Sequence, residues 1–465
     1  MRETDKSLPA DHIINMSPNI VVNNVNDKRL YLVYDGIYML HRLNWPTSST
    51  CHAYQTMRNN SIPPENIVHM SYDDVAHDPE NPIQGNLVTL PTGPNLYPGC
   101  EMDYRKEEVT PEVFLKVLTG DKEGVKKLIG RDGKVIDSGP DDRLFVYMID
   151  HGGPGVFFFP GFVELHNTDL NNALKQMYRE KRYKEMVLYM EACHSGSMFE
   201  GLLPNNINIY ITTSANPNEN ARMCCWDEFR KVYVGGVYDN AWLYNSDKAN
   251  LHKETLYQQY EVVKEACEKP KDGSHPQQYG DLSMNKEVLA QFQAKTEQYT
   301  PGMCLNTQET DGHIQGPEFT FAGIDLNNPA LDMVQIATTA RRLIESRDLS
   351  SQKREELKAK LRHMMLVKEK AESLTKDLVK AAMSSPRGVT ETDILTGKER
   401  VENSECYKAA LSLFSARCPG INMGRYPFAR RNLQAFINLC NHQPQTDVMN
   451  AILKVTEKYG ICRAL

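Results

Sequence analysis

No stretch of 18 apolar residues occurs in the 465-residue chain, so the sequence predicts no membrane-spanning helix and no membrane insertion. Met1–Asp5 carries no apolar secretion segment, which leaves a cytosolic protein or one whose targeting peptide has been removed. Cys-x-x-Cys and His-x-x-x-His spacings are absent, so no metal site is expected, and the adjacent Cys224 and Cys225 are expected to point in divergent directions. No glycine-rich phosphate loop follows a strand pattern, so neither nucleotide chemistry nor a cofactor is expected.

Charge is divided unevenly along the chain. Residues 346–465 carry 21 basic and 13 acidic side chains, a net charge of +8, whereas residues 1–345 carry 32 basic and 47 acidic side chains, a net charge of −15. The basic residues of the tail alternate with acids at helical spacing and form no Lys/Arg cluster, which argues against nucleic-acid binding. The pattern favours a basic C-terminal domain that lies on an acidic partner in the same chain.

Length and periodicity indicate an α/β core with an appendage. Helical patterns cover Thr110–Ile129 and the stripe from Leu170 to Met177. Strands that alternate with helices predict a parallel sheet covered on both faces. Four short runs rich in Val, Ile, Leu and Tyr are expected to be its buried strands: Arg29–Asp35, Leu144–Ile149, Met186–Met190 and Ile207–Thr213.

The character of the sequence changes after about residue 290. Pro301 to Pro329 is rich in Gly, Pro, Thr and Asn and is read as a linker, whereas the pattern is helical from Asp348 onward. The expected organisation is an α/β domain over residues 1–295, a connecting segment over residues 296–347 and an all-α domain over residues 348–465.

Potentially reactive side chains follow two of the predicted strands. The second runs directly into His151 and Gly152, and the third runs into Glu191 and Cys193. A strand–helix–strand unit has a right-handed crossover, and the carboxyl ends of its parallel strands share one edge of the sheet, where ligands bind. His151 and Cys193 are therefore expected to face each other at that edge.

This pairing suits a cysteine nucleophile. The thiolate of Cys193 would attack a carbonyl carbon, His151 would supply a proton to the leaving amine, and the amide N–H groups of Gly152 and Cys193 would stabilise the oxyanion. A buried Cys or a strand-end His alone is usually structural, but the two at one sheet edge favour catalysis. The neighbouring His194 is expected to face solvent rather than to compete for the thiolate.

Several segments carry a family resemblance. IDHGGPG (149–155), YMEACHSGSMF (189–199), YITTSANPNE (210–219) and CHAYQ (51–55) resemble the legumain, or asparaginyl endopeptidase, family, and the similarity extends through the helical tail. The resemblance implies a caspase-like α/β fold followed by a helical, death-domain-like prodomain. It also implies a monomeric lysosomal, vacuolar or secreted zymogen that cleaves proteins and peptides after Asn, less readily Asp, and that meets cystatin-type inhibitors.

The resemblance further implies that the tail caps the active site at neutral pH and leaves in acid. The charges of −15 and +8 give this a physical basis, because their attraction fades as carboxylates protonate; the alternative is that both faces are merely solvated. The family pattern pairs Cys406 with Cys440 and Cys418 with Cys462, whereas four reduced, buried thiols are the alternative.

The pocket for the residue before the cleaved bond, P1, departs from the family pattern. Legumains read P1 with an Arg, a Glu and an Asp; here these positions hold Trp45, Glu191 and Gly236, with Ser214 and Arg222 expected on the same wall. Either Arg222 reaches into the pocket and favours an acidic P1 side chain, or the pocket no longer reads Asn. An unpaired Glu191 in a closed pocket should be partly neutralised.

Two functions follow from these observations. The first is a legumain-like cysteine endopeptidase zymogen that cleaves after Asn or Asp once acid releases the prodomain. The alternative is a catalytically impaired legumain-like binding protein, or decoy, with an eroded P1 pocket.

Overall fold

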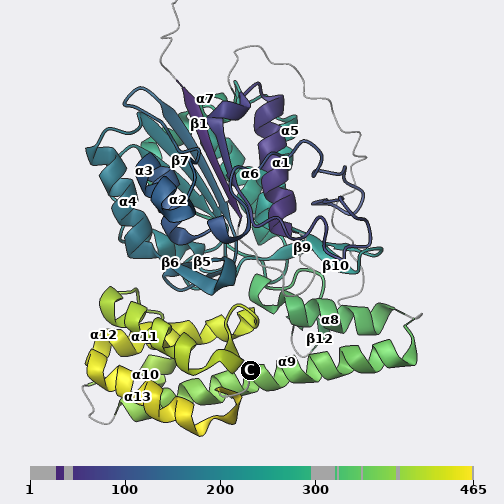
Figure 1. Cartoon of the computed structure of the whole chain (residues 1–465), viewed down its shortest axis with the longest axis vertical. Coiled ribbons are helices and arrows are strands. Elements are labelled where there is room, and N and C mark those ends of the chain that lie inside the picture. Colours follow the sequence, from purple (N-terminus) through teal and green to yellow (C-terminus); the bar gives the residue numbers. More distant parts are fainter. Residues whose placement is uncertain are drawn as a thin grey trace, which may run out of the picture.

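The computed structural model describes residues 28–35, 45–294, 320–321, 324–346, 349–383 and 388–462. An α/β body forms the upper part of the molecule, and a layer of helices from the C-terminal part of the chain lies beneath it (Figure 1). The predicted linker between Pro301 and Pro329 lies mostly outside the described residues.

A six-stranded sheet forms the centre of the body, in the order β11-β8-β7-β3-β1-β2. All four predicted strands are present and pair in parallel. The sequence analysis missed the two edge strands, of which β2 pairs in parallel with β1 and β11 pairs antiparallel with β8. The strands span β1 Arg29–Asp35, β2 Ile67–Met70, β3 Arg143–Ile149, β7 Glu185–Glu191, β8 Ile209–Thr213 and β11 Gln277–Gly280.

Helices cover both faces of the sheet, as the alternation of strands and helices predicts (Figure 1). The predicted helix from Thr110 to Ile129 is two helices, because Gly120 ends the first at φ +74° and the Asp121 side chain caps the second by accepting from the Gly124 N–H. The helices of the body are α1 Trp45–Asn59, α2 Pro111–Thr119, α3 Lys122–Ile129, α4 Asn167–Arg179, α5 Val237–Lys248, α6 Leu256–Glu268 and α7 Ala290–Gln293.

Two small antiparallel sheets lie at the end of the body that faces the C-terminal helices (Figure 1). One consists of β4 Gly152–Gly153, β5 Val156–Phe159 and β6 Val163–His166, and the other of β9 Met223–Asp227 and β10 Val232–Gly236. The first continues directly from β3, so it begins at the carboxyl edge of the main sheet.

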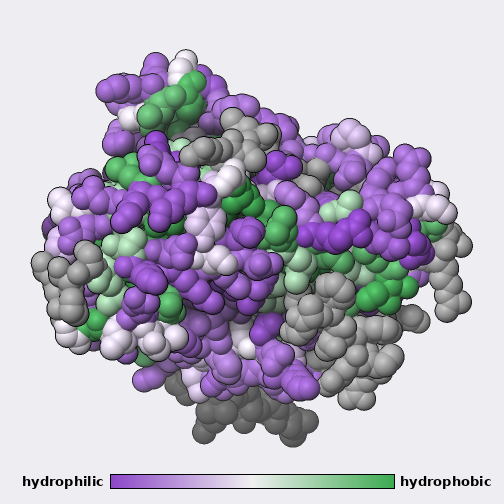
Figure 2. Space-filling view, turned by 90° about the horizontal axis from the view of Figure 1, so that it is seen from below, coloured by the Kyte–Doolittle hydropathy of each residue, from purple (hydrophilic) through white to green (hydrophobic). Residues whose placement is uncertain are grey.

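The described residues from 349 onward are mainly helical, as predicted, whereas the helix α8 was not predicted and lies within the expected connecting segment. A hairpin, β12 Thr320–Phe321 with β13 Ile324–Asp325, precedes six helices, and the longest, α9, packs against α8 and α13. The outer face of this region, seen from below, is mostly hydrophilic (Figure 2). The six helices are α8 Val334–Glu345, α9 Ser351–Ala382, α10 Glu391–Thr396, α11 Ser404–Arg417, α12 Leu433–His442 and α13 Gln445–Lys458.

Disulfides link residues in both parts of the molecule. Cys406 pairs with Cys440 and Cys418 with Cys462, which confirms the family pattern, and Cys51 pairs with Cys100. The expectation that Cys224 and Cys225 diverge is wrong, because these neighbours form a disulfide with each other. Among the described residues, Cys193 and Cys267 are free.

In the described part of the chain, no helix is long and apolar enough to cross a membrane. Within the same residues, no group of three or more His, Cys, Asp or Glu side chains is arranged to hold a metal ion.

Candidate active site

The two predicted catalytic segments lie side by side. β3 and β7 are neighbours, with Ile149 opposite Glu191, and the Asp150 N–H donates to the Glu191 carbonyl over 3.1 Å. His151 and Cys193 follow these residues, and both are buried. A Cβ on Gly152 would lie 2.1 Å from the Cys193 carbonyl oxygen, so only glycine allows the two segments to approach this closely.

Burial keeps the His151–Cys193 pair uncharged in this state. It lowers the pKa of His151 well below its usual value, and the nearby positive charge of Arg430 lowers it further. Burial also raises the pKa of the Cys193 thiol, and the negative charge of Asp332 raises it further. The described residues offer no hydrogen-bond partner to His151 Nδ1. The thiol and the imidazole are therefore both neutral here, not the reactive ion pair.

Two of the predicted pocket residues, Glu191 and Ser214, lie together next to Cys193. The Ser214 hydroxyl accepts from the Ala192 N–H over 3.1 Å and also hydrogen-bonds to Glu191. Burial raises the pKa of Glu191 well above its usual value, and the negative charge of Asp239 adds to the rise, in line with the expected neutralisation.

The sequence analysis missed Asp239. It lies in the first turn of α5, fully buried, and its carboxylate accepts a hydrogen bond from the Ser49 hydroxyl of α1. The signal available in the sequence was an acidic residue three positions after Gly236, at the start of a helix. Asp239 and Glu191 together place two buried carboxyl groups in this part of the site.

The other pocket candidates lie along β9 and β10. Gly236 ends β10 and pairs with Met223, and the Arg222 carbonyl accepts from the Val237 N–H over 3.0 Å. The Arg222 side chain is half-buried, and its Nε has no hydrogen-bond partner among the described residues. Trp45 begins α1, but its side chain lies outside the described part of the structure.

The expectation for His194 is wrong. Its ring is not free in solvent but half-buried, with Nδ1 2.9 Å from the Pro217 carbonyl oxygen. The His194 N–H also donates to the Glu219 carbonyl over 2.7 Å, so the residue anchors the turn after the nucleophile.

A segment of the chain itself runs along the site, which the sequence analysis did not anticipate. The Met223 N–H donates to the Pro329 carbonyl over 3.0 Å, and the Leu331 N–H donates to the Ala221 carbonyl over 2.9 Å. These bonds form an isolated antiparallel β-bridge between Arg222 and Ala330, so residues 329–331 lie beside residues 221–223 in the manner of an added strand. The next residue, Asp332, is buried and close enough to Cys193 to raise its pKa.

The helical domain covers the same edge of the sheet. Arg430 is buried, with its Cζ 4.4 Å from the centroid of the Phe158 ring, and burial lowers the pKa of its guanidinium to about 10. Its three side-chain nitrogens have no hydrogen-bond partner among the described residues. The next residue, Arg431, donates two hydrogen bonds to Asp332, one of them over 3.0 Å.

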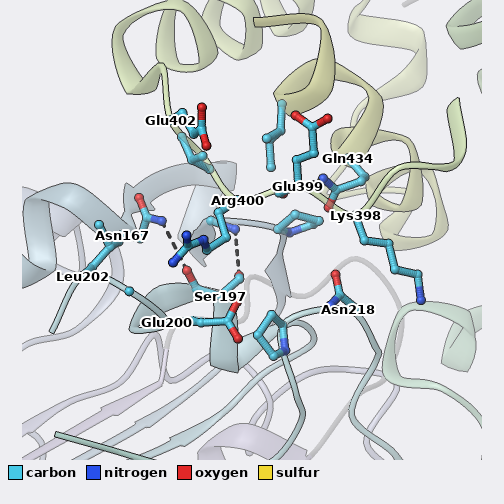
Figure 3. A pocket seen from close by; sticks show the side chains of 16 residues that line it. Asn167, Ser197, Glu200, Leu202, Asn218, Lys398, Glu399, Arg400, Glu402 and Gln434 are labelled. Carbon is cyan, nitrogen blue, oxygen red and sulfur yellow. Dashed lines mark hydrogen bonds between the residues drawn. The ribbon is translucent and has the colours of Figure 1, made fainter. Parts of the chain in front are cut away.

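Further contacts between the two parts surround this centre. The Lys408 Nζ lies 2.6 Å from Asp169 Oδ1, and the Tyr407 hydroxyl donates to the Pro154 carbonyl over 2.8 Å. A pocket of about 170 Å³ lies at the same junction, where Arg400 of the helical domain approaches Ser197 and Glu200 of the body (Figure 3).

Comparison with known proteins identifies the family. The model of the peptidase C13 family matches residues 44–295, more than half of the chain, and the model of the legumain prodomain matches residues 355–456. The chain belongs to the legumain family of cysteine peptidases. In this family member, the α/β body is the cysteine endopeptidase domain and the C-terminal helices are the prodomain of a zymogen.

Curated relatives support this assignment. Human legumain is 38% identical over 395 residues, which is 84% of each chain, and the vacuolar-processing enzyme of Vicia sativa is 34% identical over 85% of this chain and 78% of its own. The crystal structure of caspase-1 from Spodoptera frugiperda matches 59% of this chain and 94% of its own at 10% identity, with a TM-score of 0.35.

Proposed function

We propose that this cysteine endopeptidase hydrolyses peptide bonds after Asn, and less readily after Asp. Cys193 is the nucleophile, His151 carries the proton to the leaving amine, and the N–H groups of Gly152 and Cys193 stabilise the oxyanion. The observation that carries the proposal is the close approach of Gly152 to the Cys193 carbonyl, which brings the two strand ends into one site.

The P1 pocket is proposed to be lined by Glu191, Ser214, Arg222, Gly236 and Trp45. Because its pKa is raised, Glu191 is protonated in mild acid, and its O–H can then donate to the carboxamide oxygen of Asn. An ionised aspartate side chain would lie near the buried carboxyl group of Asp239, which disfavours it, and near the Arg222 guanidinium, which would accept it, so the proposal keeps Asp as the second P1 residue.

Acid release of the prodomain is proposed as the activation step. Two ion pairs help to hold the prodomain in place: Arg431 binds Asp332 of the connecting segment, and Lys408 binds Asp169 of the body. The buried His166, whose ring packs edge-to-face on Tyr407 of the prodomain, supports release in acid, because burial lowers its pKa to about 4 in the docked state. The proposed division is a catalytic domain over residues 1–295, an activation segment over 296–347 and a prodomain over 348–465.

Compartment and partners follow from the family. Relatives named legumain and vacuolar-processing enzyme support a lysosomal or vacuolar location, and protein and peptide chains are the substrates of such an enzyme. Inhibition by cystatin-type proteins and a monomeric state belong to the same proposal.

A peptide-library cleavage profile of the acid-treated protein tests this function. The proposal expects cuts after Asn, fewer after Asp, and none with Cys193→Ser. Cleavage by Cys193→Ser at the wild-type rate would refute the assigned nucleophile. Absence of cleavage by the wild type at every acidic pH would instead indicate the binding protein or decoy.

A further inference from the structure

The disulfide between the adjacent residues Cys224 and Cys225 lies inside strand β9. Met223 and Cys224 pair with Gly236 and Gly235, the pairing resumes at Trp226, and Cys225 is left out of the ladder. Cys225 has φ +67°, in the left-handed region that non-glycine residues rarely adopt. The disulfide therefore coincides with a local departure from regular strand conformation at Cys225, which is called the bend below.

This bend adjoins the segment on which an extended peptide lies. Met223, directly before the disulfide, donates its N–H to the Pro329 carbonyl, and the preceding Arg222 forms the antiparallel bridge with Ala330. The activation segment thus shows how a peptide adds to this edge, by backbone hydrogen bonds to residues 221–223. A peptide substrate that approaches Cys193 from the same side would bind the same two backbone groups, the Met223 N–H and the Ala221 C=O.

The disulfide also contacts helix α5. The side-chain nitrogen of Asn240 lies 3.5 Å from the sulfur of Cys224 and 3.4 Å from that of Cys225, and it donates to the Thr89 carbonyl over 3.0 Å. The Cys224 sulfur is 3.5 Å from the Gly236 carbonyl oxygen. The sulfurs therefore contact Asn240 and the Gly236 backbone, directly after residues 221–223 that bind the activation segment.

We propose that the Cys224–Cys225 disulfide positions the peptide substrate, by holding β9 in the bent course that presents Met223 to the substrate backbone. The proposal rests on the proposed peptidase function and adds to it a residue pair outside the catalytic centre. Loss of the disulfide lets the strand return to a regular course, which moves the docking groups and weakens substrate binding without changing the chemistry at Cys193.

A thiol reductant opens this disulfide in a balanced exchange. Two equivalents of a small thiol give the two cysteine thiols and one small-molecule disulfide, with two electrons passing from the reductant to the protein. Cys224 and Cys225 are half-buried, whereas all six cysteines of the other disulfides are buried, so a mild thiol reaches this pair first. The same reductant keeps Cys193 reduced, so variants rather than reductants give the cleaner test.

The test measures kcat and KM on one Asn-containing peptide for two acid-treated proteins. The first is the wild type, in which mass spectrometry shows Cys224–Cys225 to be oxidised, and the second is the double variant Cys224→Ser/Cys225→Ser. The expected result is a KM about five- to tenfold higher in the variant, with kcat within twofold. A second double variant, Cys224→Ser/Cys225→Gly, permits φ +67° without a disulfide and is expected to recover most of the wild-type KM.

Each outcome has one meaning. An unchanged KM in the serine variant, or a glycine variant as impaired as the serine variant, overturns the positioning role. A wild type that hydrolyses no peptide refutes the proposed function instead. If the serine variant does not fold, the glycine variant decides, because glycine at position 225 removes the cost of φ +67°, and a KM above twice the wild-type value in that folded variant overturns the proposal.

Discussion

The guanidinium of Arg430 lies over the ring of Phe158, 4.4 Å from its centroid, and so places a buried cation of the prodomain beside His151 and Cys193. Its neighbour Arg431 is different, because its side chain is 44% exposed and is hydrogen-bonded to Asp332, which is 3% exposed. Two adjacent arginines thus contribute to docking in opposite ways, one as a buried charge without hydrogen bonds among the described residues and one as the partner of a buried carboxylate.

Substitution by methionine separates the two roles. Arg430→Met keeps apolar contact with Phe158 and removes a costly buried charge, so the prodomain is expected to stay docked to a lower pH. Arg431→Met leaves Asp332 buried without its cation, so docking should weaken by about 2 kcal/mol and release should occur at a higher pH. The measurement is the pH at which half of the zymogen becomes active. Shifts of both variants in the same direction would contradict this division.

A buried histidine adds to the pH dependence of docking. His166 lies against the prodomain, with its ring edge-to-face with Tyr407. Its pKa is lowered from 6.5 to about 4, chiefly by burial and also by the charge of Lys408, whereas Asp169 opposes the shift. The docked state therefore binds fewer protons than the released state, and docking weakens as the pH falls from about 6.5 to about 4. The upper limit of this effect, reached if release restores the ordinary pKa of His166, is about 3 kcal/mol.

His166→Gln removes this proton uptake. The variant is expected to release its prodomain at a lower pH than the wild type and with about one proton fewer taken up per molecule. A pH titration of release, followed by size-exclusion chromatography or by activity, measures both quantities. An identical midpoint and proton number would show that His166 does not take part.

The contact at Gly152 predicts a large catalytic effect. In Gly152→Ala the new Cβ would lie 2.1 Å from the Cys193 carbonyl oxygen, so the two strand ends must separate. A displacement of about 1 Å typically costs about 100-fold in rate, which is the expected loss in kcat/KM. Gly139→Ala is the matched control, because its Cβ would have no neighbour closer than 3.9 Å. Comparable activity of the two variants would contradict the proposed site.

The main strands were predictable because both of their faces are buried, which leaves a continuous apolar signal in runs such as Leu144–Ile149. The edge strands were not, since Ile67–Met70 is short and Gln277–Gly280 is mostly polar and half-buried. The proximity of the strand ends that carry His151 and Cys193 was predictable because each residue follows a recognisable strand, and parallel strands share their carboxyl edge.

Contacts between distant segments were beyond a sequence argument. Nothing in Pro329 or Leu331 marks them as an added strand along Ala221–Met223, because backbone groups make the bonds. Arg430 reads as one more solvated charge in a basic tail, and only its burial beside Phe158 distinguishes it from Arg431. The charge asymmetry predicted that the tail lies on the body, but not which residues touch.

The protonation state of Glu191 leads to a further prediction. Its pKa is raised well above the usual value, first by burial and then by Asp239, so the carboxyl is neutral in acid and resembles a glutamine. Glu191→Gln is therefore expected to cleave after Asn at a pH of about 5 within threefold of the wild type, and to lose less activity as the pH rises. Measured pH profiles of kcat/KM check this. A variant inactive in acid would mean that Glu191 acts as a carboxylate.

The most direct test of the account is the rate at which iodoacetamide labels Cys193 before and after acid treatment, measured by mass spectrometry. Cys267, which is also free and buried in the described part of the chain, is the internal reference. The account predicts slow labelling of Cys193 in the neutral zymogen, where its pKa is raised and the prodomain covers it, and labelling at least tenfold faster once acid has released the helices. Equal rates in the two states, or labelling of Cys193 no faster than that of Cys267 after release, would contradict it.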